Sequence, residues 1–518
     1  MLAVLVAGAT AYTPHSSHTV QHEQAAAPAP TCTTQTFAGD ETPGHSHHSA
    51  SDATEASSSE WQPGTWFAED GHYFHCHWLE RISGHCGTRQ PMNLTTCTSL
   101  DASSGLYTKT FAAGPFTSTG GYNWRAIHFN ATMETDDHQA SRRMAIRSYS
   151  FTTHADSPSG EEIGFPPLHN HHTTVTGHEP GGATGHATAD RIWLAQQADG
   201  QCSGEIDGFT CLDHDLRPGG YYVPYQSDWG LIENSLWNDA RPEGSPPLVW
   251  FFKFTLVFEE LTEEKTTALQ PVAEWGIVHP FIRNSSDNTL EVPLDQDSFY
   301  VMEGTAPMSG SIIKTPHNRT LSHVHTHAIK FQVAFLINAT AAELGLDASR
   351  FASSSGCDVV NTTRAGFASN DEMIRHLSTS HPKLFSLTDP DSRLICRAIG
   401  NTARVGDYNY DRKSQFDCAA DSVREGDPFT SIVFFGSRQG ETAPPSGECG
   451  SRGAANANST ADVYPIHMHW FIYYAPTADN PTPLFRNQYR PFVGAPKDWT
   501  MDTWEGDPSN RCNIMHES

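Results

Sequence analysis

Short runs of aromatic and β-branched residues recur along the chain from Trp61 onward, separated by clusters of Gly, Pro, Asn and Asp. Runs of about four to eight such residues, bounded by turn-forming residues, are typical of strands in β-sandwiches and barrels. Helical periodicity is limited to Ala339–Phe351 and Asn370–Leu377. The pattern therefore predicts a mainly β protein. The clearest predicted strands are Arg143–Thr152, Leu248–Val257, Ala328–Ile337, Thr430–Phe435 and Trp470–Tyr474.

A polar, charged segment, Glu259–Thr267 (EELTEEKTT), separates two strand-rich parts of the chain. Each part is long enough for one β-sandwich with long loops. We therefore expect two tandem β-sandwich (jelly-roll-like) domains, over residues 63–270 and 271–495. Residues 12–62 are rich in Ser and His and hold too few aliphatic residues to order themselves, which predicts a disordered leader. Residues 496–518 are predicted to be a polar tail.

Several features predict a protein of the secretory route. Residues 1–11 are apolar and end in a small-x-small pattern, as in a signal peptide, and no later stretch is apolar enough to span a membrane. The chain has 11 cysteines, which are scattered as expected for disulfides in an oxidising compartment. We expect a secreted or secretory-lumen glycoprotein with no integral membrane segment beyond the signal peptide. Its N-x-S/T sequons are Asn93, Asn130, Asn284, Asn318, Asn338, Asn361 and Asn458.

Charge and histidine content change this picture in different ways. The formal net charge of −27 would repel phosphate backbones, so nucleic acid is excluded as a partner. The chain holds 29 histidines, where average composition would give roughly ten. They collect in short clusters, and imidazole is the commonest neutral ligand of copper, zinc and iron. The clusters therefore predict bound transition metal.

The most specific of these clusters is LSHVHTHAIKFQVAFLI. His323, His325 and His327 alternate strictly, so a strand places all three on one face, with about 7 Å between successive positions. An earlier cluster, PPLHNHHTTVTGHE, holds the adjacent His171 and His172. Neighbouring residues of a strand point to opposite faces, so these two need a twist or a bulge, or a strand edge where both can turn inward, to share a metal.

Two further clusters leave more than one interpretation open. In YPIHMHWFIYY, alternation places His467 and His469 on one face and Met468 on the other, and Met468 is either a thioether ligand or core filler. In GHYFHCHWLERISGHC, His72 and its neighbours lie among closely spaced cysteines, so disulfides compete with a metal role.

The order of these elements resembles the copper type II ascorbate-dependent monooxygenases, which include the peptidylglycine α-hydroxylating and dopamine β-monooxygenases. LHNHHTTVTG resembles the adjacent histidines of their first copper site, and SHVHTHA resembles their second-domain H-T-H element. DLRPGGYYVPYQSDWGLIENSLWND, SRLICRAIGNTARVG and IHMHWFIYY resemble further family segments, the last of them the Met-bearing strand. The family has two β-sandwich domains, each with one copper, facing one another across a solvent-filled cleft.

The resemblance implies a set of metal ligands and a reaction. It implies two copper ions, with ascorbate as reductant and a small molecule or peptide as the hydroxylated substrate. Leu236 stands where the family has its third first-domain histidine, for which His169, His178 or His214 would have to substitute. His467 or His469 would replace or join Met468 at the second site. The implied metal ligands are His171, His172, His325, His327, Met468 and His469.

Two other hypotheses compete with a copper monooxygenase. The absence of a histidine at Leu236 favours a noncatalytic secreted protein that binds copper or acts in signalling. A different β-fold metalloenzyme, of cupin or multicopper-oxidase type, would need a glutamate ligand beside the H-x-H element or a thiolate copper site.

Overall fold

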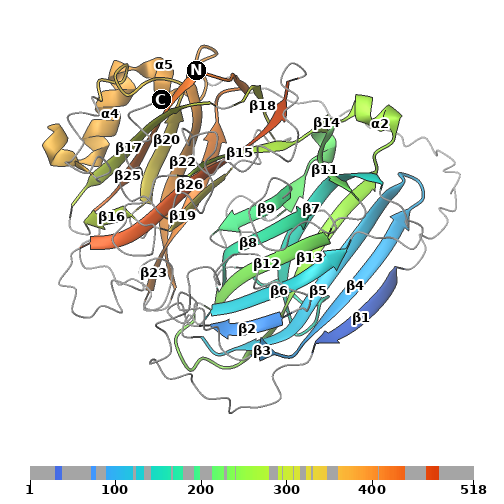
Figure 1. Ribbon diagram of the computed structural model, residues 1–518. Helices are drawn as coiled ribbons and strands as arrows, with labels where there is room; N and C mark the ends of the chain where they lie inside the picture. The colour runs from blue at the N-terminus through green and yellow to red at the C-terminus, as the bar shows by residue number, and fades with distance from the viewer. Residues whose placement is uncertain are drawn as a thin grey trace, which may run out of the picture.

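The computed structural model describes residues 30–37, 72–76, 89–120, 124–132, 142–164, 167–178, 192–198, 213–226, 230–239, 241–278, 290–293, 296–306, 308–314, 323–327, 331–346, 360–405, 408–437 and 463–477. The predicted signal peptide, most of the predicted leader and the predicted tail lie outside these residues. Within them the protein is mainly β, as predicted. Its strands are almost entirely antiparallel and form four sheets arranged as two pairs (Figure 1).

The N-terminal pair consists of a first and a second sheet, whose strands all lie between Thr31 and Pro271. In spatial order the first sheet contains β1 (Thr31–Phe37), β4 (Met92–Asp101), β5 (Leu106–Ser118), β13 (Leu248–Glu260), β7 (Arg143–Ala155), β11 (Tyr221–Gln226) and β14 (Gln270–Pro271), and β10 (Asp213–Asp215) also pairs with β7. The second contains β3 (Arg89–Gln90), β2 (His72–Cys76), β6 (Trp124–Thr132), β12 (Gly230–Asp239), β8 (Leu168–His178) and β9 (Ile192–Ala198).

The C-terminal pair consists of a third and a fourth sheet. The third contains β15 (Ala273–Val278), β26 (Val463–Pro476), β18 (Gly310–Ile312) and β24 (Ser422–Val423), and both β16 (Leu290–Pro293) and β19 (His323–His327) pair with β26. The fourth contains β21 (Val360–Asn361), β17 (Ser298–Thr305), β25 (Pro428–Phe435), β20 (Phe331–Ile337), β22 (Leu394–Val405) and β23 (Tyr408–Cys418). The five strongest predicted strands correspond to β7, β13, β20, β25 and β26.

Each pair of sheets encloses a core rich in aromatic side chains. Between the first and second sheets, the indole of Trp237 on β12 lies 6.0 Å from that of Trp250 on β13. Between the third and fourth sheets, Trp470 on β26 is buried and donates a hydrogen bond of 2.9 Å from its indole nitrogen to the Ser431 hydroxyl. Burial of such large rings contributes most of the stabilisation of a sandwich. The predicted β-sandwich architecture is therefore confirmed.

Helices cover the face of the fourth sheet that points away from the third (Figure 1). These helices are α4 (Asn370–Ser380) and α5 (Pro382–Phe385). Elsewhere, the short helix α2 (Glu263–Ala268) follows β13, and the 3-10 helices η3 (Arg217–Gly219) and η4 (Thr362–Ala365) form single turns. The helix predicted at Asn370–Leu377 is confirmed as α4. The helix predicted at Ala339–Phe351 is wrong for residues 339–346, which form turns, because Gly345 takes a φ of +69° and ends any helical run. Residues 347–351 lie outside the described residues.

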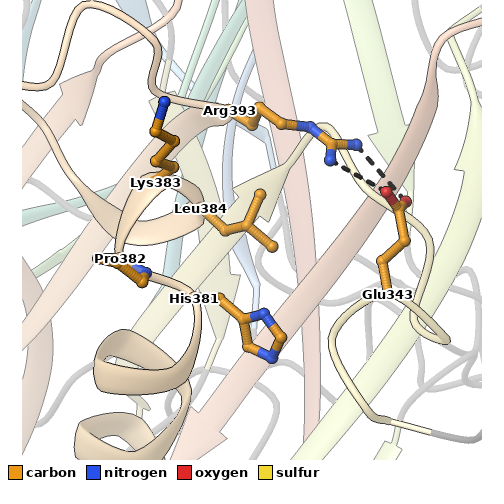
Figure 2. A pocket seen from close by; sticks show the side chains of 6 residues that line it. All are labelled: Glu343, His381, Pro382, Lys383, Leu384 and Arg393. Carbon is orange, nitrogen blue, oxygen red and sulfur yellow. Dashed lines mark hydrogen bonds and ion pairs between the residues drawn. The ribbon is translucent and has the colours of Figure 1, made fainter.

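A pocket of roughly 520 Å³ opens beside α5 and is lined by charged side chains that already have partners. Figure 2 shows Arg393 directed at Glu343, with 3.0 Å between the guanidinium and the carboxylate. This hydrogen bond holds the pKa of Glu343 down at about 2. Lys383, also at the pocket, pairs with Asp391 at 2.8 Å.

Part of the predicted disordered leader is ordered. Thr31–Phe37 forms the edge strand β1, paired in register with β4 and tied to it by the Cys32–Cys97 disulfide. Four of the seven residues of this strand are threonine, and the Thr34 and Thr95 hydroxyls are 3.0 Å apart across the ladder. β-branched residues favour strands, so the prediction of disorder does not hold here. A second disulfide, Cys396–Cys418, joins β22 to β23.

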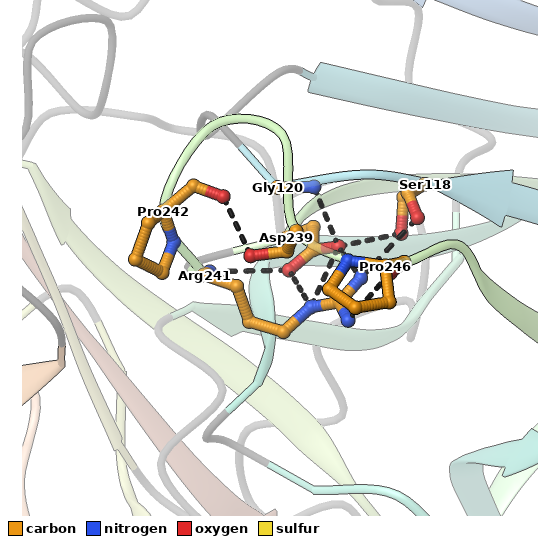
Figure 3. Close-up of polar contacts among 7 residues, drawn as sticks. Ser118, Gly120, Asp239, Arg241, Pro242 and Pro246 are labelled. Atoms are coloured by element: carbon orange, nitrogen blue, oxygen red, sulfur yellow. Dashed lines mark hydrogen bonds and ion pairs between the residues drawn. The ribbon is translucent and has the colours of Figure 1, made fainter.

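A buried carboxylate fastens the second sheet to the first. Asp239, at the end of β12, accepts hydrogen bonds from the Ser118 hydroxyl at 2.8 Å and from the Gly120 amide at 3.0 Å, both at the end of β5 (Figure 3). The guanidinium of Arg241 completes the network with an ion pair of 2.6 Å. Burial alone would raise the pKa of Asp239, but the hydrogen bonds from Arg241 and Ser118 outweigh it and leave that pKa lowered.

We predict that Asp239→Ala lowers the free energy of unfolding by about 3 kcal/mol, because it leaves Arg241 and the β5 groups without their acceptor. Asp215→Ala is the matched control, since Asp215 also pairs with the arginine two residues on but has a side chain 38% exposed, against 2% for Asp239. An exposed pair contributes only about 0–1 kcal/mol, so the control is expected to change little. Urea unfolding measures both variants, and equal losses would contradict the assignment.

The stabilisation by Asp239 is also expected to depend on pH. The pKa of Asp239 is lower in the folded protein than in the unfolded chain. Its contribution to the free energy of unfolding is therefore complete above the unfolded carboxyl pKa of about 4, and it is lost as pH falls through the folded pKa. The difference in unfolding free energy between the wild type and Asp239→Ala should therefore shrink below about pH 4. A difference that stays constant down to about pH 2 would show that ionised Asp239 does not stabilise this junction.

Candidate metal centres

Two H-x-H elements that lie far apart in the sequence are neighbours in the third sheet. Strand β19 runs antiparallel to β26, with His325 opposite His469 and His327 opposite His467. Residues directly opposite one another share a face of the sheet, with Cβ atoms about 4.5–5.5 Å apart. The register therefore places these four histidine positions on one face, as two successive cross-strand pairs, with His323 opposite Phe471 on the same face.

The burial of the rest of β26 identifies that face. Trp470 and Ile472 are buried in the core between the third and fourth sheets, whereas Phe471 and Tyr473 belong to the core of the N-terminal pair. By alternation, the positions of His467 and His469 fall on the side of Phe471. The four histidine positions therefore lie on the face of the third sheet that is turned toward the N-terminal pair.

Met468 occupies a different place. It is paired with Thr326, and alternation puts it on the same side as Trp470, which faces the core of the C-terminal pair. The backbone thus separates Met468 from His325, His327 and His469, with which it was predicted to share a site. Thioether ligation by Met468 in that site would require a local departure from this ladder.

Strand β8, which holds the adjacent His171 and His172, contains a bulge, one of the arrangements expected to let neighbouring histidines share a metal. In its ladder with β12, His172 pairs with Leu236 and Asn170 pairs with Trp237, so His171 is an extra residue. A bulge of this kind interrupts the alternation of side chains. Positions 171 and 172 are consequently not forced to opposite faces, which makes joint use of these histidines geometrically accessible.

The position expected to hold a third histidine is directly across from this bulge. Leu236 pairs with His172, while its neighbour Trp237 is buried in the core, so position 236 lies on the outer face of the second sheet. Of the proposed substitutes, His169 pairs with Asn238 and His178 pairs with Gly230, at the other end of the ladder. His214 pairs with Tyr149 in the first sheet. Of these three histidines, the register therefore leaves only His169 near the bulge, two cross-strand rows from Leu236.

The two histidine-bearing strands lie near one another. Strand β19 contacts β9, the edge strand of the second sheet that is nearest the C-terminal pair (Figure 1). Strand β9 in turn pairs with β8, with Ala198 opposite His172. A single strand therefore stands between the two histidine-bearing strands at this junction.

Other features of the described residues do not form a competing metal centre. Among the side chains that the structure describes, no three His, Cys, Asp or Glu groups are arranged to hold a metal ion. The pocket beside α5 has its cationic groups in ion pairs and lies on the helix-covered side of the fourth sheet (Figure 2). Within the described part of the chain, no helix combines the length and the apolar character needed to cross a membrane.

Comparisons with known proteins do not identify a family. No protein-family model and no curated protein matches the chain. A solved structure with partial similarity is the crystal structure of PBCV-1 VP54 fitted into a cryo-EM reconstruction of the virophage Sputnik. It has a TM-score of 0.19 and 8% identity, and the match covers 71% of this chain and 93% of that chain. A similarity at this level carries no argument about function.

The ladder between β19 and β26 indicates which residues of β26 would bind copper. We expect His469→Ala to weaken copper binding by at least roughly tenfold, because position 469 shares a face with His325 and His327. Met468→Leu should leave the affinity unchanged within about twofold, since a volume-conserving apolar swap on the core-facing side is tolerated. Copper titration against a competing chromophoric chelator measures both variants. Loss of copper in Met468→Leu would show that the Met468 thioether is a ligand in the wild type.

Proposed function

We propose that the protein is a secreted copper-dependent monooxygenase that hydroxylates a C–H bond of a small molecule or peptide. The observation that carries this proposal is the register of β19 and β26, which gathers His325, His327, His467 and His469 on one face. Several imidazoles on one rigid ladder are a donor set that suits copper, because imidazole is a borderline ligand with high affinity for this metal. The residues present therefore fit a copper ion, which would be held by these histidines.

The bulge on β8 supports a second copper position. His171 and His172 would contribute two imidazoles there, on a sheet whose edge strand β9 contacts β19. The β26 histidines precede buried aromatic residues of the same strand, and β8 pairs with β12, which carries the buried Trp237. Such strands hold ligands more accurately than loops do. The nearness of the two sets suits a reaction in which electrons delivered at one position are used at the other.

Copper would supply the redox chemistry that activates O₂ toward a C–H bond. In the overall reaction the substrate C–H bond is replaced by C–OH, and the second oxygen atom leaves as water. The reaction consumes two electrons and two protons, which a reductant such as ascorbate provides as it is oxidised. The histidines of β19 and β26 would keep the metal at the junction of the two pairs of sheets.

A second candidate function is a noncatalytic secreted copper-binding or signalling protein. It is favoured by Leu236, an apolar residue at the position opposite His172, where a third histidine would complete the first set. Two neutral ligands bind copper less firmly than three. A chain that keeps only the β19–β26 position would bind one copper ion but lack the second copper ion that delivers an electron to the reaction.

Metal content separates these two functions. The proposed monooxygenase is expected to retain two coppers per chain after desalting, falling to one in the His325→Ala, His327→Ala double variant, with loss of ascorbate-dependent O₂ uptake. The matched control is His376→Ala, His381→Ala, which removes two histidines beside the helices of the fourth sheet. One copper falling to none, with no O₂ uptake in the wild type, would favour the noncatalytic function. Unchanged copper in the double variant would contradict both.

Leu236→His should strengthen the weaker position. The new imidazole would lie directly opposite His172, so we expect copper at β8 to survive dialysis against a chelator that strips it from the wild type. Ile232→His is the control, because it lies on the same face of β12 but opposite Thr176. Equal retention in the two variants would show that position 236 is not part of a copper site.

A further inference from the structure

A second pair of histidines lies on the outer face of the second sheet. Strand β2 runs antiparallel to β6, and His72 is directly opposite His128. Ile127, the neighbour of His128, is completely buried in the core of the N-terminal pair. Alternation therefore puts positions 72 and 128 on the outer face, the face that also carries position 172.

We propose that His72 and His128 form a two-imidazole site for a divalent transition metal, Cu²⁺ or Zn²⁺. Opposed residues of an antiparallel pair have Cβ atoms about 4.5–5.5 Å apart, and metal–nitrogen bonds are about 2.0–2.1 Å long. Two imidazoles on such positions can converge on one ion, with solvent completing its coordination. With only two protein ligands the site exchanges its metal readily and empties on desalting.

This site is separate from the histidines of the proposed function. Strand β12 lies between β6 and β8, so His128 and His172 are two strand spacings apart, or roughly 10 Å, before any offset along the strands. They are also offset in register, because His128 pairs with Asn234 and His172 pairs with Leu236. One metal ion cannot span that separation. The site is an independent, exchangeable metal position on the same face.

The test uses the full chain carrying alanine at His171, His172, His325 and His327, so that failure of the proposed function does not affect it. The probe is Cu²⁺–iminodiacetate, which leaves coordination positions open for two neighbouring imidazoles. We expect His72→Asn and His128→Asn each to remove one bound equivalent, and the double variant to remove no more than either single variant. His75→Asn is the matched control on the same strand, because it pairs with Arg125 on the opposite face.

Far-UV circular dichroism and the thermal midpoint without metal establish that each variant keeps the fold. If His72→Asn disturbs the short strand β2, His128→Asn on the longer β6 decides the outcome. The proposal is overturned if His128→Asn binds as many equivalents as its parent. It is also overturned if the double variant loses two equivalents, which would mean that the histidines bind separately, or if His75→Asn loses as much as either.

Discussion

Burial of both faces of β26 is the constraint on which the candidate site depends. One face contributes Trp470, Ile472 and Tyr474 to the core of the C-terminal pair, and the other contributes Phe471 and Tyr473 to the core of the N-terminal pair. A strand fixed in this way cannot slip by one residue without moving every aromatic ring to the wrong core. The same register decides where the H-M-H element falls. Its histidines therefore lie on the side of the junction, together with those of β19.

This constraint also shapes the chemistry that the protein can support. A donor set made of imidazoles alone favours Cu²⁺ more than a set containing a thioether, which is a soft ligand for Cu⁺. At β8 the bulge leaves His171 and His172 free of strict alternation, but the facing residue is Leu236. The two positions are thus unequal. In the proposed function, the position with more imidazoles would lie at the junction of the two pairs of sheets, and the position with fewer would lie on the outer face of the second sheet.

Much of the fold could be predicted from the sequence, because strands carry their own local signal. The runs that became β7, β13, β20, β25 and β26 are dominated by aromatic and β-branched residues, and these form both cores. The period of a strand indicated that His171 and His172 need some irregularity to share a face, and the structure has a bulge there. Edge strand β1 was missed because threonine-rich segments look like polar linkers until a partner strand and a disulfide are known.

The site was only half predictable, because pairing between distant strands leaves no mark in either segment. The alternation of His323, His325 and His327 indicated a shared face, but the sequence of that strand did not predict that it pairs with β26. The opposition of His72 and His128 was hidden for the same reason. The proposed copper chemistry and the secretory route remain predictions that rest on the ligand pattern and on sequence signals.

The most direct measurement of the central claim is anomalous diffraction at the copper edge from crystals of the copper-loaded protein. We predict a strong peak between β19 and β26, within bonding distance of imidazole nitrogens from both strands and with no sulfur ligand. A peak coordinated by Met468, or no peak at this ladder while copper is bound elsewhere, would contradict it.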